Sequence, residues 1–165
     1  MVRLPVRHGP TLQRWSFASW PRQWSFFGRA RRSGGDGVDV VTNRQSNDYQ
    51  AVSPAVELDP GTYGVIVRGA VRSGGFALQV LDVKKQQFVV ANYYSADQRR
   101  SSTNFDNATM FAKFSLASNA KIQLVLANFS PGRTASRWRL QSVSLVRQPR
   151  PCGCSPRDSN AWISR

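Results

Sequence analysis

Apolar and polar side chains alternate along most of residues 38–148, a pattern that predicts β-strands rather than helices. The clearest stretch is residues 58–82, LDPGTYGVIVRGAVRSGGFALQVLD, in which large apolar side chains alternate with small or polar ones. Period-2 alternation of this kind is typical of a strand with one face in a core. Because Ser73-Gly74-Gly75 separates the two alternating halves, the stretch predicts one β-hairpin.

Further strand-like runs follow one another with turn residues between them and with no convincing helix. These runs are residues 38–42, 49–52, 56–58, 87–94, 109–116, 121–129 and 136–146. In the last run the apolar parity changes between Leu140 and Val143, which predicts a β-bulge at Gln141-Ser142 that keeps both side chains inward. The number and spacing of the runs predict an all-β fold, an antiparallel β-sandwich of about eight strands.

The two ends of the chain differ in composition from the middle, and three parts are therefore expected. Residues 1–36 hold seven Arg against one Asp, whereas residues 37–148 hold 13 Lys or Arg against seven acids, within a total charge of +14. Residues 1–37 are predicted to be a basic, aromatic-containing extension and linker, disordered in itself. Residues 38–148 are then the β-sandwich domain, and residues 149–165 are a second disordered tail.

Other interpretations of the extension remain open. Trp20, Trp24 and Phe27 have the i, i+4, i+7 spacing of a short amphipathic helix, which would suit an anionic membrane surface. An Arg-rich segment with almost no acids is also typical of a transit peptide. No stretch is apolar enough for a transmembrane segment, and no signal peptide is evident, so a cytoplasmic location is favoured.

Four segments resemble galactose-binding-like jelly rolls, an architecture that bacterial carbohydrate-binding modules share. They are PGTYGVIVR (60–68), SGGFALQVLD (73–82), LVLAN (124–128) and RWRLQSVSL (137–145). The resemblance covers residues 45–147 and implies a jelly roll that binds a glycan or accompanies a cell-surface polysaccharide enzyme. It would also allow a structural Ca²⁺ near Glu57 and Asp59, although a charged turn is the simpler interpretation, and we predict no metal or other cofactor.

The residues needed for catalysis are poorly represented, and we predict that the protein is not an enzyme. His8 is the only histidine and lies in the extension, so no Ser-His or Cys-His pair is available inside the domain. The carboxylates of the domain are scattered, mostly at predicted turns, where Asp is common for backbone reasons. Cys152 and Cys154 lack a second ligand pair at zinc-finger spacing.

A polar and aromatic region around the end of strand 87–94 is the candidate ligand site. Sugars are bound by aromatic side chains against their C–H faces and by amide, carboxylate or guanidinium groups at their hydroxyls. Such side chains occur at the end of this strand, in the long loop 95–107 and in a second loop expected to approach it, although Asn128 is alternatively a turn residue. The candidate glycan-binding residues are Asn92, Tyr93, Tyr94, Arg99, Arg100, Asn104, Phe105, Asn128 and Arg133.

Two further functions remain open at this point. A structural or protein-interaction domain without a small ligand would have the same strand pattern. Nonspecific binding to anionic surfaces through the Arg-rich tails is also expected from a net charge this positive. No helix-turn-helix, zinc finger or aromatic RNA-binding signature occurs, so no specific nucleic-acid partner is predicted.

Overall fold

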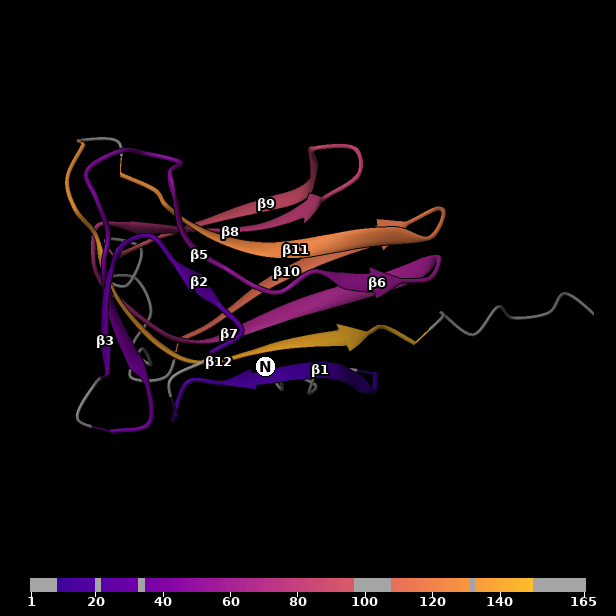
Figure 1. Ribbon diagram of the computed structural model, residues 1–165, viewed down its shortest axis with the longest axis horizontal. Coiled ribbons are helices and arrows are strands. Elements are labelled where there is room, and N and C mark those ends of the chain that lie inside the picture. Colours follow the sequence, from indigo (N-terminus) through magenta and orange to yellow (C-terminus); the bar gives the residue numbers. More distant parts are fainter. Residues whose placement is uncertain (1–8, 20–21, 33–34, 97–107, 131–132, 150–165) are drawn as a thin grey trace, which may run out of the picture.

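Two antiparallel β-sheets pack face to face in the computed structural model (Figure 1). The structure describes residues 9–19, 22–32, 35–96, 108–130 and 133–149. The strands within these residues are β1 (Thr11–Ser16), β2 (Ser25–Phe26), β3 (Arg29–Arg32), β4 (Val38–Val41), β5 (Tyr49–Val52), β6 (Val56–Leu58), β7 (Gly61–Ser73), β8 (Gly75–Asp82), β9 (Gln87–Ser95), β10 (Ala108–Leu116), β11 (Ala120–Asn128) and β12 (Arg137–Arg147).

Sheet A has the strand order β10-β7-β12-β4-β3, with β1 also beside β12. Sheet B has the order β2-β5-β11-β8-β9, with β6 also beside β11. The strand pairs in both sheets are antiparallel. The predicted all-β sandwich of jelly-roll type is therefore confirmed.

The core lies between the two sheets and is built from the inward parity of each strand. On β7 this parity is the one predicted, because Tyr63, Val65, Val67 and Val71 are all buried. The predicted bulge is present in β12, where the register with β7 shifts between Leu140 and Ser142. It keeps the apolar residues on both sides of it in the core.

The predicted hairpin at residues 58–82 is wrong, because its two strands belong to different sheets. β7 pairs with β10 and β12 in sheet A, whereas β8 pairs with β9 and β11 in sheet B. Gly74, with φ of 69°, turns the chain from one sheet to the other, and a side chain there would collide with Ser136. Two alternating runs around a glycine turn occur both in hairpins and in connections between two sheets. The sequence pattern therefore does not distinguish a hairpin from such a connection.

The expectation of a disordered extension is wrong for residues 9–19 and 22–32. β1 pairs with β12, β2 with β5 and β3 with β4, so this segment supplies strands to both sheets. Trp15, Phe17 and Trp24 are buried in the main core. The arginines of the segment face outward and obscure the short alternation of apolar and polar side chains. The strands with which the segment pairs lie far away in the sequence.

The part of the chain that the structure describes contains no helix long and apolar enough to cross a membrane. Residues 1–8 and 150–165 lie outside it, and with them His8, both cysteines and almost all of the predicted C-terminal tail.

Candidate functional site

The nine predicted site residues do not form one cluster in the structure. Arg99, Arg100, Asn104 and Phe105 lie outside the described residues. The other five lie at three different places: between the edges of the two sheets, inside the core, and on the outer face of sheet B with the loop at its end.

Asn92 and Tyr94 lie between the two sheet edges. The Tyr94 hydroxyl accepts a hydrogen bond from the Phe111 N–H and donates one to the Phe111 carbonyl, to which the Asn92 side-chain amide also donates at 2.7 Å. β9 ends sheet B and β10 ends sheet A, so both side chains satisfy backbone groups on the free edge of β10. Their polar atoms are used within the fold.

Asn128 is fully buried, and its side chain holds two loops against the end of β11. Its amide NH₂ group is within hydrogen-bonding distance of the carbonyl oxygens of Asn43 at 3.0 Å, Gln45 at 3.1 Å and Thr134 at 3.4 Å. Its side-chain oxygen accepts a hydrogen bond from the Ser136 hydroxyl at 2.6 Å. The alternative interpretation of Asn128 as a strand-end structural residue fits this geometry.

Tyr93 faces outward from sheet B and remains 47% exposed. Its ring packs against Phe129, with 4.7 Å between the ring centroids and 45° between the planes. In register with Tyr93 on the two neighbouring strands are Ala77 and Ala127. Both alanines are fully buried, in an apolar cluster against which Tyr49 and Phe129 pack. The expected approach of the loop after Asn128 to Tyr93 does occur.

A second aromatic pair extends this surface. Tyr49 of β5 lies opposite Ala127 and packs against Phe88 of β9, with 6.2 Å between ring centroids. Phe88 is 45% exposed. The sequence analysis missed both residues as site candidates, because only the register across four strands brings them together. We call Tyr49, Phe88, Tyr93 and Phe129 the aromatic face.

A buried amide lies on the same side of sheet B. Gln79 stands between Ala91 and Val125 in the cross-strand register, and it is 4% exposed. Its side-chain oxygen has no hydrogen-bond partner among the described residues. An unsatisfied buried acceptor of this kind is uncommon in folded proteins and favours a polar group binding nearby.

A polar cavity of about 850 Å³ lies at the end of sheet B where β11 meets β5. It is lined by Arg44, Gln45, Ser46, Asn47, Asp48 and Arg133. The loop is held to β11 by the Asn47 N–H, which donates to the Asn128 carbonyl at 2.6 Å, and the Asp48 carboxylate accepts from the Asn43 amide. Asn47 and Arg133 both adopt the left-handed backbone region, and for Arg133 this costs about 1 kcal/mol.

The cavity and the aromatic face are close in sequence at two points, because Asp48 precedes Tyr49 and Arg133 follows Phe129 by four residues. Of the five predicted site residues that the structure describes, Tyr93 and Arg133 are the two that are exposed. Within the described residues, no group of three or more His, Cys, Asp or Glu side chains is arranged to hold a metal ion.

Comparison with known proteins identifies the fold. No protein-family model matches the sequence, and no curated protein matches it. The CBM22-1 and GH10 modules of xylanase 10B from Clostridium thermocellum, complexed with xylohexaose, are similar over 87% of this chain, with a TM-score of 0.57 and 18% identity. This chain spans only 29% of that structure.

Two smaller structures are matched over nearly their whole length. A family 6 carbohydrate-binding module from Clostridium cellulolyticum, in complex with xylose, aligns over 81% of this chain and 95% of its own, with a TM-score of 0.52 and 16% identity. The C-terminal CBM6 of LamC from Zobellia galactanivorans aligns over 82% and 98%, with a TM-score of 0.51 and 10% identity. The chain thus has the β-sandwich fold seen in carbohydrate-binding modules.

Proposed function

We propose that this protein is a noncatalytic module that binds a glycan on the outer face of sheet B. The observation that carries the proposal is the exposed ring of Tyr93, which is held against Phe129. A polar cavity is lined by residues that precede Tyr49 and follow Phe129 in the chain. One apolar face of a sugar stacks on an aromatic ring, while its hydroxyls need donors and acceptors at the rim. The fold shared with carbohydrate-binding modules supports the same function, by analogy.

The site is pre-organised. Tyr93 is placed by the pairing of β9 with β8, and Phe129 restricts its ring, so little rotamer entropy is lost when a ligand stacks on it. Arg44 and Arg133 bring guanidinium donors to the cavity, and Asp48 brings an acceptor. The aromatic face thus binds the apolar side of the sugar, and the cavity binds its hydroxyls.

The noncatalytic part of the proposal rests on the charges in the cavity. Asp48 is the one carboxylate among the described residues that line it, and its carboxylate accepts a hydrogen bond from Asn43. Glycoside hydrolysis generally uses two carboxyl groups on opposite sides of the scissile bond. We infer that such a module serves beside a polysaccharide-handling enzyme, as the module in the C. thermocellum structure lies beside a GH10 module.

Binding of neutral oligosaccharides to the full chain tests the proposal. A neutral glycan array, with xylohexaose among the probes, is followed by calorimetric titration of each hit. Loss of the Tyr93 ring in Tyr93→Ala is expected to weaken binding about 30-fold, the effect of removing ~2 kcal/mol at an aromatic hot spot. Tyr93→Phe keeps the ring and should retain most of the affinity.

Two results would overturn this function. One is a folded protein that binds no probe on the array. The other is a bound glycan whose affinity is the same for the wild type and for Tyr93→Ala. Either result would leave the fold with the role of a structural or protein-interaction domain.

A further inference from the structure

A polar row crosses four neighbouring strands on the outer face of sheet A, the side of the sandwich away from the aromatic face. Ser16 of β1 lies opposite Ser142 of β12. Ser142 in turn lies opposite Arg68 of β7, and Arg68 lies opposite Thr109 of β10. With strands ~4.8 Å apart, the row is about 14 Å long.

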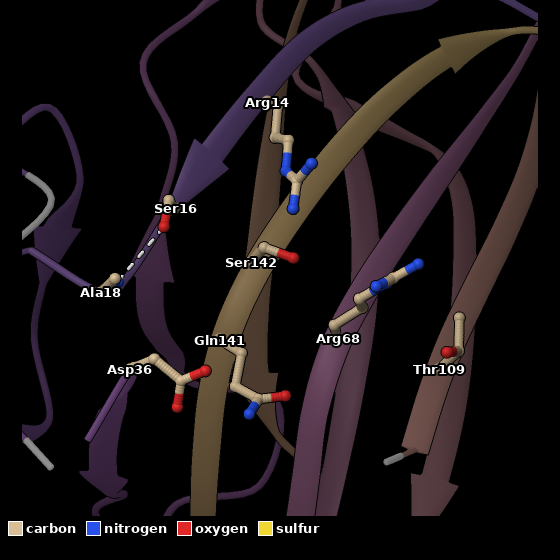
Figure 2. Close-up of a pocket in the computed structure, with 8 residues that line it drawn as sticks. All are labelled: Arg14, Ser16, Ala18, Asp36, Arg68, Thr109, Gln141 and Ser142. Atoms are coloured by element: carbon tan, nitrogen blue, oxygen red, sulfur yellow. Dashed lines mark hydrogen bonds between the residues drawn. The ribbon is translucent and has the colours of Figure 1, made fainter. Parts of the chain in front are cut away.

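The row borders a groove of about 380 Å³, within the usual range of small-ligand sites of roughly 300–1,000 Å³. Figure 2 shows Arg14 and Arg68 reaching the groove from strands on either side of β12, with Ser142 between them. The bulge of β12 lies here, and bulges often re-aim side chains beside binding sites. Gln141, the bulged residue, also lines the groove.

The polar groups of this groove have few partners within the fold. The two ion pairs among the described residues are Lys85 with Asp82 and Arg139 with Asp36, so neither includes Arg14 or Arg68. No hydrogen bond from either guanidinium to another described residue is present.

Ser142 adds a hydroxyl group to the lining of the groove. It is only 6% exposed, yet its hydroxyl forms no hydrogen bond with the described part of the chain. A hydroxyl that lines the groove and has no partner among the described residues can donate to or accept from a ligand bound there.

The charge of the groove selects the ligand. Asp36 is the one carboxylate among the described lining residues, and its oxygen is 3.7 Å from the Arg139 guanidinium. Arg14 and Arg68 are therefore in excess, and planar guanidinium groups form paired hydrogen bonds to carboxylate and sulfate oxygens. No aromatic side chain lines the described groove, whereas proteins that bind single-stranded nucleic acid stack its bases on aromatic rings.

We propose that this groove binds an acidic saccharide. Its carboxylate or sulfate is held between Arg14 and Arg68, and its neighbouring hydroxyls are bound by Ser142 and Thr109. This site is distinct from the aromatic face on the other outer surface of the sandwich, and neither depends on the other.

The test titrates the full chain with four probes in the same buffer: an oligogalacturonate, its methyl ester, a sulfated oligosaccharide of equal length, and a single-stranded DNA of equal charge. Saturable binding of the oligogalacturonate or the sulfated probe is expected, with no binding of the neutral ester. The tighter of the two acidic probes identifies the anion as a carboxylate or a sulfate.

Charge variants locate the site. Arg14→Gln and Arg68→Gln are each expected to weaken binding of the acidic probe roughly tenfold, or ~1.4 kcal/mol. Arg72→Gln is the matched control, because Arg72 is exposed on β7 with the same parity as Arg68, yet it lies outside the groove. It removes the same charge and should change the affinity by less than about twofold.

Any of four results would overturn the proposal: no binding of either acidic saccharide, equal binding of the methyl ester, equal or tighter binding of the DNA, or an equal loss in Arg72→Gln. All three Arg side chains are exposed, so the variants are expected to fold, and their thermal unfolding verifies this. Neutral-glycan binding that depends on Tyr93 should be unchanged in Arg14→Gln, which separates the failure of one site from failure of the other.

Discussion

The Tyr94 hydroxyl is joined to the backbone of Phe111 by two hydrogen bonds, accepting from its N–H at 2.8 Å and donating to its carbonyl at 2.5 Å. Tyr94 belongs to the last strand of sheet B, and Phe111 belongs to the last strand of sheet A. One side chain therefore connects the two sheet edges and satisfies a backbone that would otherwise be free to pair with another chain.

Tyr94→Phe is expected to destabilise the fold by about 1–3 kcal/mol, because two hydrogen bonds of roughly 0.5–1.5 kcal/mol each are lost. The ring would still pack against Phe76, so the loss of stability would come from the missing hydroxyl. Urea unfolding at equilibrium measures the difference. Tyr93→Phe is the matched control, since the structure shows no hydrogen bond of the Tyr93 hydroxyl to another described residue, and the two variants should not unfold alike.

Asn128→Asp should be among the most damaging single-atom changes in the chain. It replaces an NH₂ group that faces the carbonyls of Asn43, Gln45 and Thr134 with an acceptor that carries a charge in the core. We expect a loss of about 3 kcal/mol or more at neutral pH.

Because protonation removes the charge, the loss in Asn128→Asp should shrink in acid. Denaturant unfolding of the variant and the wild type at two pH values measures this. A variant as stable as the wild type at neutral pH would contradict the structural role of Asn128.

Much of the fold can be predicted from the sequence because alternation reports directly which face of a strand is buried. The parity of Tyr63 and Val65 and the bulge after Leu140 were both read correctly in this way. Alternation says nothing about partners, however. The assignment of β7 and β8 to different sheets depends on long-range pairing with β10 and β11, which no local pattern encodes.

The candidate site likewise has some features that local alternation predicts and others that depend on long-range strand pairing. Tyr93 and Tyr94 are neighbours in sequence and so face opposite sides of the strand, which is why one packs in the sandwich and the other is exposed. The pairing of Tyr49 with Phe88 needed the order of four strands in sheet B. The groove between Arg14 and Arg68 was harder still to predict, because it depends on β1. Arg14 of β1 belongs to an Arg-rich segment whose composition resembles that of a disordered tail.

The N-terminal segment is expected to be essential for folding. Trp24 is 5% exposed and packs edge-on against Trp15 and Phe17, with ring centroids 5.7 and 5.4 Å away. Trp24→Ala should cost about 3–5 kcal/mol, as for other large aromatic residues in a core. Phe27→Ala, at an exposed aromatic of the same segment, should cost far less.

Thermal unfolding followed by circular dichroism compares the two variants, and a chain lacking residues 1–37 extends the test. That truncated chain loses β1, β2 and β3 and should not fold cooperatively. A truncated chain as stable as the full one would contradict the placement of these strands.

Asp82 should make the stability of the β8–β9 turn depend on pH. Its carboxylate accepts hydrogen bonds from the N–H groups of Lys84 and Lys85, each at 3.1 Å, and the Lys85 ammonium lies 3.3 Å away. The hydrogen bond from the Lys85 N–H is the main cause that lowers the pKa of the Asp82 carboxyl, while desolvation acts in the opposite direction.

A carboxyl whose pKa is lowered by folding stabilises the fold fully above its ordinary pKa of about 3.9, and this contribution is lost as the pH falls through the lowered value. Asp82→Asn should therefore be less stable than the wild type near neutral pH, and the difference should close below pH ~4. Urea midpoints of both proteins across this range measure it. A difference that stays constant down to the acid limit would show that the charge of Asp82 does not stabilise the turn.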